Sequence, residues 1–280
     1  MDVKNGYALT NYHTHTWRCQ HSKGSEEEFV LRAIQNGFSL FGFADHTPWP
    51  YQSDYVSFMR MRLDQFGDYE QTVRSLEKKY AKQIRILLGL ECEAFPQYMS
   101  WLADFKKEHL DYVILGNHYD YTDEGNHANS KPLADTGGFY FGRCERPDEI
   151  RRYGQRTVSG IQTGIFDYVA HPDLFCFNYP KFDADCIAVS RDICAAAEAY
   201  HIPLEYNLLG VQHSENKNGH GMGYPYRSFW EIASQFHIQA IIGLDAHLVS
   251  HIDRTDLYDH AHRFMKELGI PTISYLEEKQ

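Results

Sequence analysis

The segment Ser39-Leu40-Phe41-Gly42-Phe43-Ala44-Asp45-His46 decides the fold class of this chain. Its first six residues are nearly all apolar, which is typical of a strand buried on both faces in a parallel sheet. The run then ends abruptly in a carboxylate and an imidazole. Apolar runs that end in polar side chains recur along the chain, and the predicted fold follows from that recurrence.

This pattern predicts seven strands, separated by stretches with helical spacing. The strands are expected at 7–9, 39–44, 84–90, 112–116, 167–170, 202–207 and 239–244, and the helices at 25–36, 56–83, 97–108, 147–163, 185–200, 226–236 and 255–268. Strands that alternate with helices indicate a parallel sheet. We therefore expect residues 1–280 to form a single α/β domain, a distorted seven-stranded (β/α)7 barrel, with 271–275 as a short tail.

Local signals support two details of this pattern. Ser25 followed by Glu28 is typical of a capping box at a helix start, and Gly37 of a left-handed helix end. The segments 119–145 and 210–223 lack periodicity, so we expect long loops there. Such loops are uncommon unless they cover something, and these two are expected to cover a substrate.

Composition limits the classes of function. The formal net charge is -11 and the pI is about 5.8, so we expect neither nucleic acid nor an anionic membrane as a partner. No run of about 18 apolar residues occurs and the first residues are polar, so a cytoplasmic protein is expected. The six cysteines are scattered without a Cys-x-x-Cys pair, which favours reduced thiols.

Histidines and carboxylates stand where the predicted strands end. His13 and His15 are two residues apart, so in an extended chain they point the same way. Other strand ends carry His46, Glu91, His118, His171, Asn207, Asp245 and His247. The carboxyl ends of the strands of an α/β barrel meet at one rim. Imidazoles mixed with carboxylates suit zinc, iron or manganese, and so many donors exceed one tetrahedral site.

Each of these residues also has an ordinary structural interpretation. A buried histidine can be satisfied by a backbone carbonyl, and Asp245 can cap the following helix. For one residue alone the structural role is the more common. For most strand ends together it is not, because the barrel brings those ends to one place.

The ordered motifs resemble the PHP family, which is named for polymerase and histidinol phosphatase domains. They are His13-Thr14-His15, His21, Ala44-Asp45-His46, Gly89-Leu90-Glu91, Gly116-Asn117-His118, Ala170-His171-Pro172 and Gly243-Leu244-Asp245-Ala246-His247. The resemblance covers nearly the whole chain and implies three divalent metal ions, zinc, iron or manganese. It implies a first ion on His13, His15, Glu91 and Asp245, a second on Glu91, His118 and His171, and a third on His21, His46 and His247.

The same resemblance implies a metal-dependent phosphomonoesterase. A metal-bound hydroxide held by His13, His15, Glu91 and Asp245 would attack the phosphorus of a small polar substrate. The segment 203–207 followed by Gly210, and later Tyr224-Pro225, resembles the monofunctional histidinol-phosphate phosphatase branch. That likeness implies L-histidinol phosphate as substrate.

The chain departs from that branch near the expected substrate. Where an arginine usually follows the glycine of the loop, this chain has Val211-Gln212-His213, and Leu244 stands where a serine is often found. Candidate substrate contacts are Asn207, His213, Arg227 and Arg254, with Arg156 and Arg191 as further cations. Each arginine also suits a solvated helix face.

Other functions stay open at the level of sequence. The chain could be a PHP phosphoesterase for a sugar phosphate or a nucleotide. It could be an amidohydrolase-type metal hydrolase, although such enzymes generally carry a lysine at the end of the fourth strand, where this chain has His118. It could also be a non-catalytic metal-binding relative. The sequence does not predict the oligomeric state.

Overall fold

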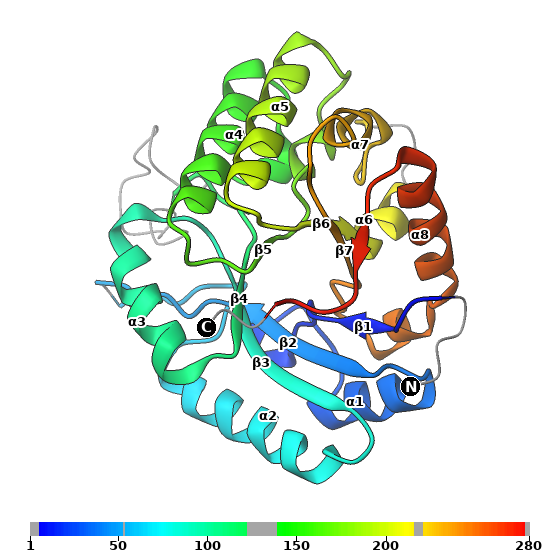
Figure 1. Cartoon of the computed structure of the whole chain (residues 1–280). Coiled ribbons are helices and arrows are strands. Elements are labelled where there is room, and N and C mark those ends of the chain that lie inside the picture. Colours follow the sequence, from blue (N-terminus) through cyan, green and yellow to red (C-terminus); the bar gives the residue numbers. More distant parts are fainter. Residues whose placement is uncertain (1–5, 53, 122–138, 216–220, 278–280) are drawn as a thin grey trace.

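The computed structural model describes residues 6–52, 54–121, 139–215 and 221–277. Its centre is a sheet of eight parallel strands in chain order, curled into a half-barrel with helices around it (Figure 1). The strands are β1 (Thr10–Asn11), β2 (Leu40–His46), β3 (Arg85–Cys92), β4 (Tyr112–Leu115), β5 (Tyr168–Val169), β6 (Leu204–Asn207), β7 (Ala240–Gly243) and β8 (Thr272–Ile273). The predicted α/β class with a curled parallel sheet is confirmed.

Helices follow most of the strands and cover the outer side of the sheet. They are α1 (Glu26–Gln35), α2 (Phe66–Tyr80), α3 (Met99–His109), α4 (Pro147–Gln162), α5 (Ala184–Ala199), α6 (Leu208–Glu215), α7 (Arg227–Ala233) and α8 (Asp256–Leu268). The predicted capping box is confirmed, since the Ser25 side chain accepts from the backbone N–H of Glu28. Gly37 follows α1 with φ of 80°, in the left-handed region that favours glycine.

The longest pairing in the sheet aligns two candidate site residues. β2 and β3 pair from Leu40 opposite Arg85 to His46 opposite Glu91. Every residue of β2 is buried, as its continuous apolar character predicts. Packing on both faces therefore fixes the register that holds His46 beside Glu91.

The prediction of seven strands is wrong, because the segment expected as a tail forms an eighth strand. Thr272 and Ile273 pair with β7 opposite Ala240 and Ile241. At the other end of β7 the chain bridges directly to the first strand segment, Thr14 opposite Ala246. β7 therefore pairs with β8 at its amino end. Beyond its carboxyl end, near the candidate site, the segment after β7 lies beside the segment after β1.

Two further boundaries differ from the prediction. The helix expected over 56–83 begins only at Phe66, after a short 3-10 turn at Leu63–Gln65. The loop expected over 210–223 begins inside α6, which runs to Glu215. Residues 216–220 of that loop, and 122–138 of the loop expected over 119–145, lie outside the described residues.

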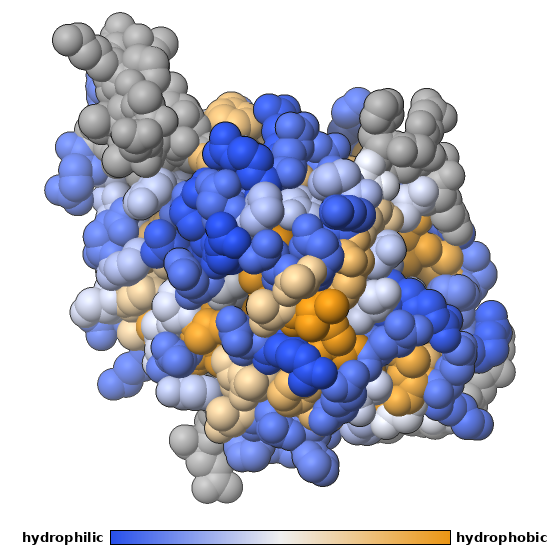
Figure 2. Space-filling view, turned by 90° about the horizontal axis from the view of Figure 1, so that it is seen from above, coloured by the Kyte–Doolittle hydropathy of each residue, from blue (hydrophilic) through white to orange (hydrophobic). Residues whose placement is uncertain are grey.

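Hydrophilic side chains cover most of the face drawn in Figure 2, with smaller apolar patches between them. In the part of the chain that the structure describes, no helix combines the length and the apolar character needed to span a membrane.

Candidate metal centre

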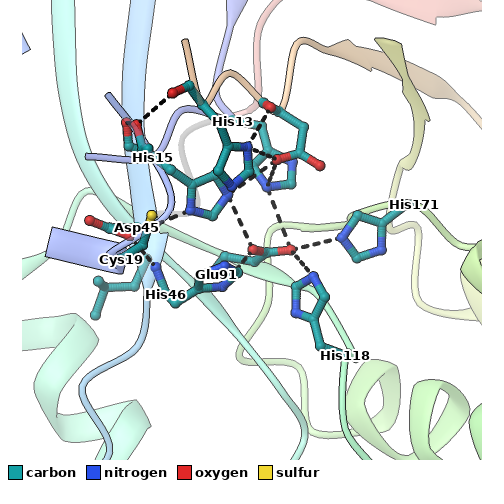
Figure 3. Close-up of polar contacts among 12 residues, drawn as sticks. His13, His15, Cys19, Asp45, His46, Glu91, His118 and His171 are labelled. Atoms are coloured by element: carbon teal, nitrogen blue, oxygen red, sulfur yellow. Dashed lines mark hydrogen bonds and ion pairs between the residues drawn. The ribbon is translucent and has the colours of Figure 1, made fainter. Parts of the chain in front are cut away.

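Polar side chains from the carboxyl ends of the strands meet at one end of the barrel (Figure 3). The structure brings together all nine predicted ligands: His13, His15, His21, His46, Glu91, His118, His171, Asp245 and His247. The side chains of His13 and His15 are fully buried, and Glu91 is 1% exposed. His21 is the most exposed of them and lies at the outer edge of the cluster. The convergence expected from the strand ends is therefore present.

Two carboxylates face the His-x-His pair. The Nε2 atom of His15 lies 3.2 Å from Oδ1 of Asp245 and 3.4 Å from Oε2 of Glu91. His13 Nε2 lies 3.5 Å from the nearer oxygen of each carboxylate. Ligand atoms of His13, His15 and Asp245 all lie within 4.8 Å of one another. These three residues can share one metal ion.

The carboxylate of Glu91 lies at the centre of the cluster, with His118 and His171 on one side and His46 on the other (Figure 3). Its Oε1 lies 2.8 Å from His171 Nε2 and 3.5 Å from His118 Nε2. Its Oε2 lies 3.0 Å from His46 Nδ1. Because its two oxygens face different imidazoles, Glu91 can bridge two ions.

A third group of donors surrounds His247. One set that can hold an ion consists of His15, His46 and His247, and another consists of Cys19, His21 and His247. The His21 and His247 rings are stacked with their centroids 4.8 Å apart. From the sequence, Cys19 is expected only to be a reduced thiol. The structure places this buried thiol beside the predicted third group.

Orphaned polar atoms test whether the cluster fits metal ions. Among the described residues, the following buried atoms of the cluster make no hydrogen bond: His13 Nε2, His15 Nε2, His46 Nδ1, Glu91 Oε2, His118 Nδ1, His171 Nδ1 and Asp245 Oδ1. Leaving a buried polar atom without a partner costs about 1 to 3 kcal/mol. Most of these atoms face one another across the cluster, and the donor set of imidazoles and carboxylates suits zinc, iron or manganese. The residues present therefore fit divalent metal ions.

Carboxylates behind the histidines hold the rings in place. Glu205 Oε1 lies 2.8 Å from His13 Nδ1, and Asp45 Oδ1 lies 3.4 Å from His15 Nδ1. A carboxylate that accepts from Nδ1–H leaves the Nε2 lone pair for a metal. Glu93 lies 3.6 Å from His118 Nδ1 and is itself held by the buried guanidinium of Arg60.

These carboxylates were not among the site residues predicted from the sequence. Glu205 had a sequence signal, because it precedes Asn207 by two residues in an apolar strand and so shares its face. Glu93 stands in the same relation to Glu91.

Mutual electrostatics keeps the carboxylates charged. Burial opposes the charged form of Glu91, but the facing imidazoles of His118 and His13 outweigh it and hold its pKa well below the usual value. Burial likewise opposes protonation of His15, yet the carboxylates of Asp245 and Asp45 raise its pKa to about 9. Burial and the charge of His15 hold the pKa of His46 well below its ordinary value. The cluster thus combines ionised carboxylates with closely packed imidazoles.

Two of the predicted ligands have unusual backbone conformations. His171 has φ of 29° and Asp245 has φ of 50°, in the region that residues with a Cβ rarely adopt. Next to the cluster, a Cβ at Gly116 would collide with Glu91, and one at Gly243 would collide with Glu205. Glycine is required at these two strand ends because carboxylates pass close to the backbone.

The predicted substrate residues are found in different places. Asn207 is buried below the cluster, where its Nδ2 donates to Glu205 and, at 3.2 Å, to Asp245. Arg227 forms ion pairs with Glu231 and Glu267 on exposed helix faces. Arg254 pairs with Asp256. Only His213 lines the pocket over the cluster. The structure therefore does not bring Arg227 or Arg254 to the pocket.

A pocket of about 730 Å³ opens over the cluster. Its polar end carries His46, His118, Asp245 and His247, and its other walls are largely apolar or aromatic: Phe58, Met59, Tyr119, Tyr140, Leu174, Phe177, Leu209, Tyr224 and Leu248. A cavity of about 790 Å³ lies among the amino ends of β6, β7 and β8, away from the cluster. The first of these is the candidate substrate pocket, because it contacts the donor atoms.

Two relatives match this chain over nearly its whole length. A protein of Deinococcus radiodurans named "Probable histidinol-phosphatase" is 24% identical, over 97% of this chain and 98% of that protein. A protein of Schizosaccharomyces pombe with the same name is 23% identical, over 95% of this chain and 89% of that protein.

Among solved structures, histidinol phosphate phosphatase from Lactococcus lactis, complexed with zinc, L-histidinol and phosphate, has a similar fold. The TM-score is 0.67 at 18% identity, and the match covers 95% of each chain. The PHP domain model matches residues 11–207, more than half of the 280 residues, and this range contains the strands β2 to β6 and most of the candidate ligands. The chain therefore belongs to the PHP domain family.

Proposed function

We propose that this chain is a metal-dependent phosphomonoesterase that hydrolyses L-histidinol phosphate to L-histidinol and phosphate. The observation that carries the proposal is the set of orphaned donor atoms at the polar end of the pocket. The family and the names of the relatives support phosphate ester chemistry. The aromatic walls favour a substrate with a flat ring, such as imidazole, over a sugar phosphate.

We infer three divalent ions in the site. His13, His15, Glu91 and Asp245 would hold the first, Glu91, His118 and His171 the second, and His21, His46 and His247 the third. When bound, such ions supply positive charge for the phosphoryl oxygens and activate water as a nucleophile. The protein's own residues fix the ligand atoms, and Glu205 and Asp45 hold the rings of His13 and His15 from behind.

The first experiment is a substrate panel. Purified protein loaded separately with zinc, manganese or iron is assayed for phosphate release from L-histidinol phosphate, sugar phosphates and nucleotides. We expect the highest kcat/KM for L-histidinol phosphate. A preference for a sugar phosphate or a nucleotide would support phosphomonoesterase activity but contradict L-histidinol phosphate as the substrate. No phosphate release from any monoester would contradict the proposed function.

The second experiment tests the ligands. We expect His13→Ala and Asp245→Ala to lower bound metal per chain and to reduce turnover at least about a hundredfold, because each removes a donor from the first site. Elemental analysis after gel filtration measures the metal. His260→Ala, at an exposed position on α8, is the control. Wild-type metal content in both site variants would contradict the ligand assignment.

A further inference from the structure

One cation lines the candidate substrate pocket among the described residues, and it is Lys23. We propose that the Lys23 ammonium binds the phosphoryl group of the substrate and selects for phosphomonoesters. This inference rests on the proposed function and adds a substrate-binding residue to it. Lys23 is not among the substrate contacts predicted from the sequence.

The backbone fixes Lys23 beside the third group of donors. Its N–H donates to the carbonyl of His247 at 2.9 Å, and Lys23 bridges in parallel to Leu248, which also lines the pocket. The hydroxyl of the preceding Ser22 donates to the same carbonyl at 2.9 Å. The flexible side chain therefore starts from an anchored position two residues after His21.

The ammonium of Lys23 is available for a ligand. Its residue is exposed, and within the described ranges it forms no ion pair and its side chain makes no hydrogen bond. Nearby cations are engaged: Arg18 pairs with Glu26 and Asp68, and Arg60 pairs with Glu93. The chain has a net charge of -11, so a lysine at this pocket without an acidic partner among the described residues favours the binding of an anion there.

The chemistry of the ligand matches this position. A phosphomonoester is close to a dianion at neutral pH and offers three strong acceptor oxygens. An ammonium group is a compact donor suited to such oxygens, and hydrogen bonds between charged partners are the stronger ones. Metal ions on the cluster would face one side of the phosphoryl group, and Lys23 would approach from the rim next to His247.

The test compares Lys23→Gln and Lys23→Arg with a matched control, Lys82→Gln, which changes an exposed lysine far from the pocket lining. In the metal-loaded enzyme we expect Lys23→Gln to raise KM for the best monoester about tenfold, while kcat changes less than about threefold. Lys23→Arg should restore most of the loss. Metal content should equal that of the wild type in all three variants.

Binding of inorganic phosphate gives a second readout that needs no turnover. Calorimetry on the metal-loaded proteins should show phosphate binding about tenfold weaker in Lys23→Gln than in the wild type and in Lys82→Gln. Unchanged KM and unchanged phosphate affinity in Lys23→Gln would overturn the inference, as would wild-type protein that binds no phosphate. If no monoester is hydrolysed but Lys23→Gln still weakens phosphate binding, the proposed function fails and the phosphate site stands.

Discussion

Glu205 touches three strand ends with one carboxylate. Its Oε1 lies 2.8 Å from His13 Nδ1, and its Oε2 accepts from the backbone N–H of His171 at 3.1 Å. The Nδ2 of Asn207 donates to the same Oε2 at 2.9 Å and also donates to Oδ2 of Asp245 at 3.2 Å. Three of the proposed ligands are therefore oriented through a single buried side chain that touches no pocket lining.

We expect Glu205→Gln to weaken metal binding about ten- to a hundredfold without unfolding the protein. The amide keeps the size of the side chain, but one of its ends becomes a donor. The amide NH2 group must then face either the Nδ1–H of His13 or the donors of His171 and Asn207, and donor would meet donor in both cases. Competition with a coloured chelator measures the metal affinity, and Glu77→Gln, on the exposed face of α2, is the control. Equal affinities in the two variants would rule out the positioning role.

At this scale the sequence predicted which residues gather, because histidines and carboxylates at strand ends are conspicuous. It did not predict the roles of Glu205, Asp45 or Glu93, because these roles depend on which histidine each carboxylate faces in the folded structure. Arg227, predicted as a substrate contact, does not line the pocket. Its partner Glu231 lies one turn further along the same helix, α7, whereas Glu267 comes from α8 and is brought beside Arg227 only by the packing of the two helices.

The first and last segments of the fold meet around His262 of α8. Its ring stacks on Tyr7 with centroids 3.6 Å apart, and its Nδ1 lies 3.1 Å from Oγ1 of Thr272 in β8. Burial lowers the pKa of His262 to about 4. One side chain thus joins the last helix, the last strand and the segment before β1.

This contact makes stability depend on pH with a known sign. The folded pKa of His262 lies below the unfolded value of about 6.5, so the neutral ring stabilises the fold above about pH 6.5. That contribution is lost as the pH falls toward about 4. In His262→Phe, which keeps a stacking ring, the free energy of unfolding should fall less between about pH 7 and about pH 5, by roughly 1 kcal/mol after discounting for partial exposure.

Urea unfolding of the chelated proteins at the two pH values measures this difference. Chelation removes the separate effect of acid on metal binding. His260→Gln, on the exposed side of the same helix, is the control. A slope against pH in His262→Phe equal to that of the wild type would show that the ring does not titrate in this range.

Strong apolar periodicity made most elements predictable, and weak or misleading periodicity explains the errors. β8 has two paired residues, too few to distinguish a strand from a tail by pattern. Residues 56–62 carry apolar side chains at helical spacing, but Met59 and Met61 pack into the core from irregular backbone, and α2 begins at Phe66. Spacing alone cannot separate those two arrangements.

For the whole molecule, the metal centre lies where the first and last parts of the sheet meet. The backbone N–H of His15 donates to the carbonyl of Ala246 at 2.9 Å, and the backbone N–H of Ala246 donates to the carbonyl of His13 at 3.1 Å. Ions held by His13, His15 and Asp245 would therefore tie together segments from the two ends of the chain.

We expect removal of the metal by a chelator to lower Tm by roughly 5 to 10 °C, because an ion that binds only the folded state at a hundred times its Kd adds about 2.7 kcal/mol. Far-UV circular dichroism below the transition should stay unchanged, since the apolar core does not depend on the ions. Calorimetric scans with and without added zinc or manganese measure Tm. A metal-independent Tm would contradict binding to this cluster.

The pairing between the segments after β1 and β7 also fixes when the centre can form during biosynthesis. Asn11 and Leu244, joined by a hydrogen bond at 2.8 Å, are 233 positions apart in the chain. A growing polypeptide on the ribosome presents His13 and His15 early, yet lacks Asp245 and His247 until most of translation is complete. The site proposed on His13, His15, Glu91 and Asp245 can therefore form only after β7 has been made, whereas Glu91, His118 and His171 are all present in the chain well before that point.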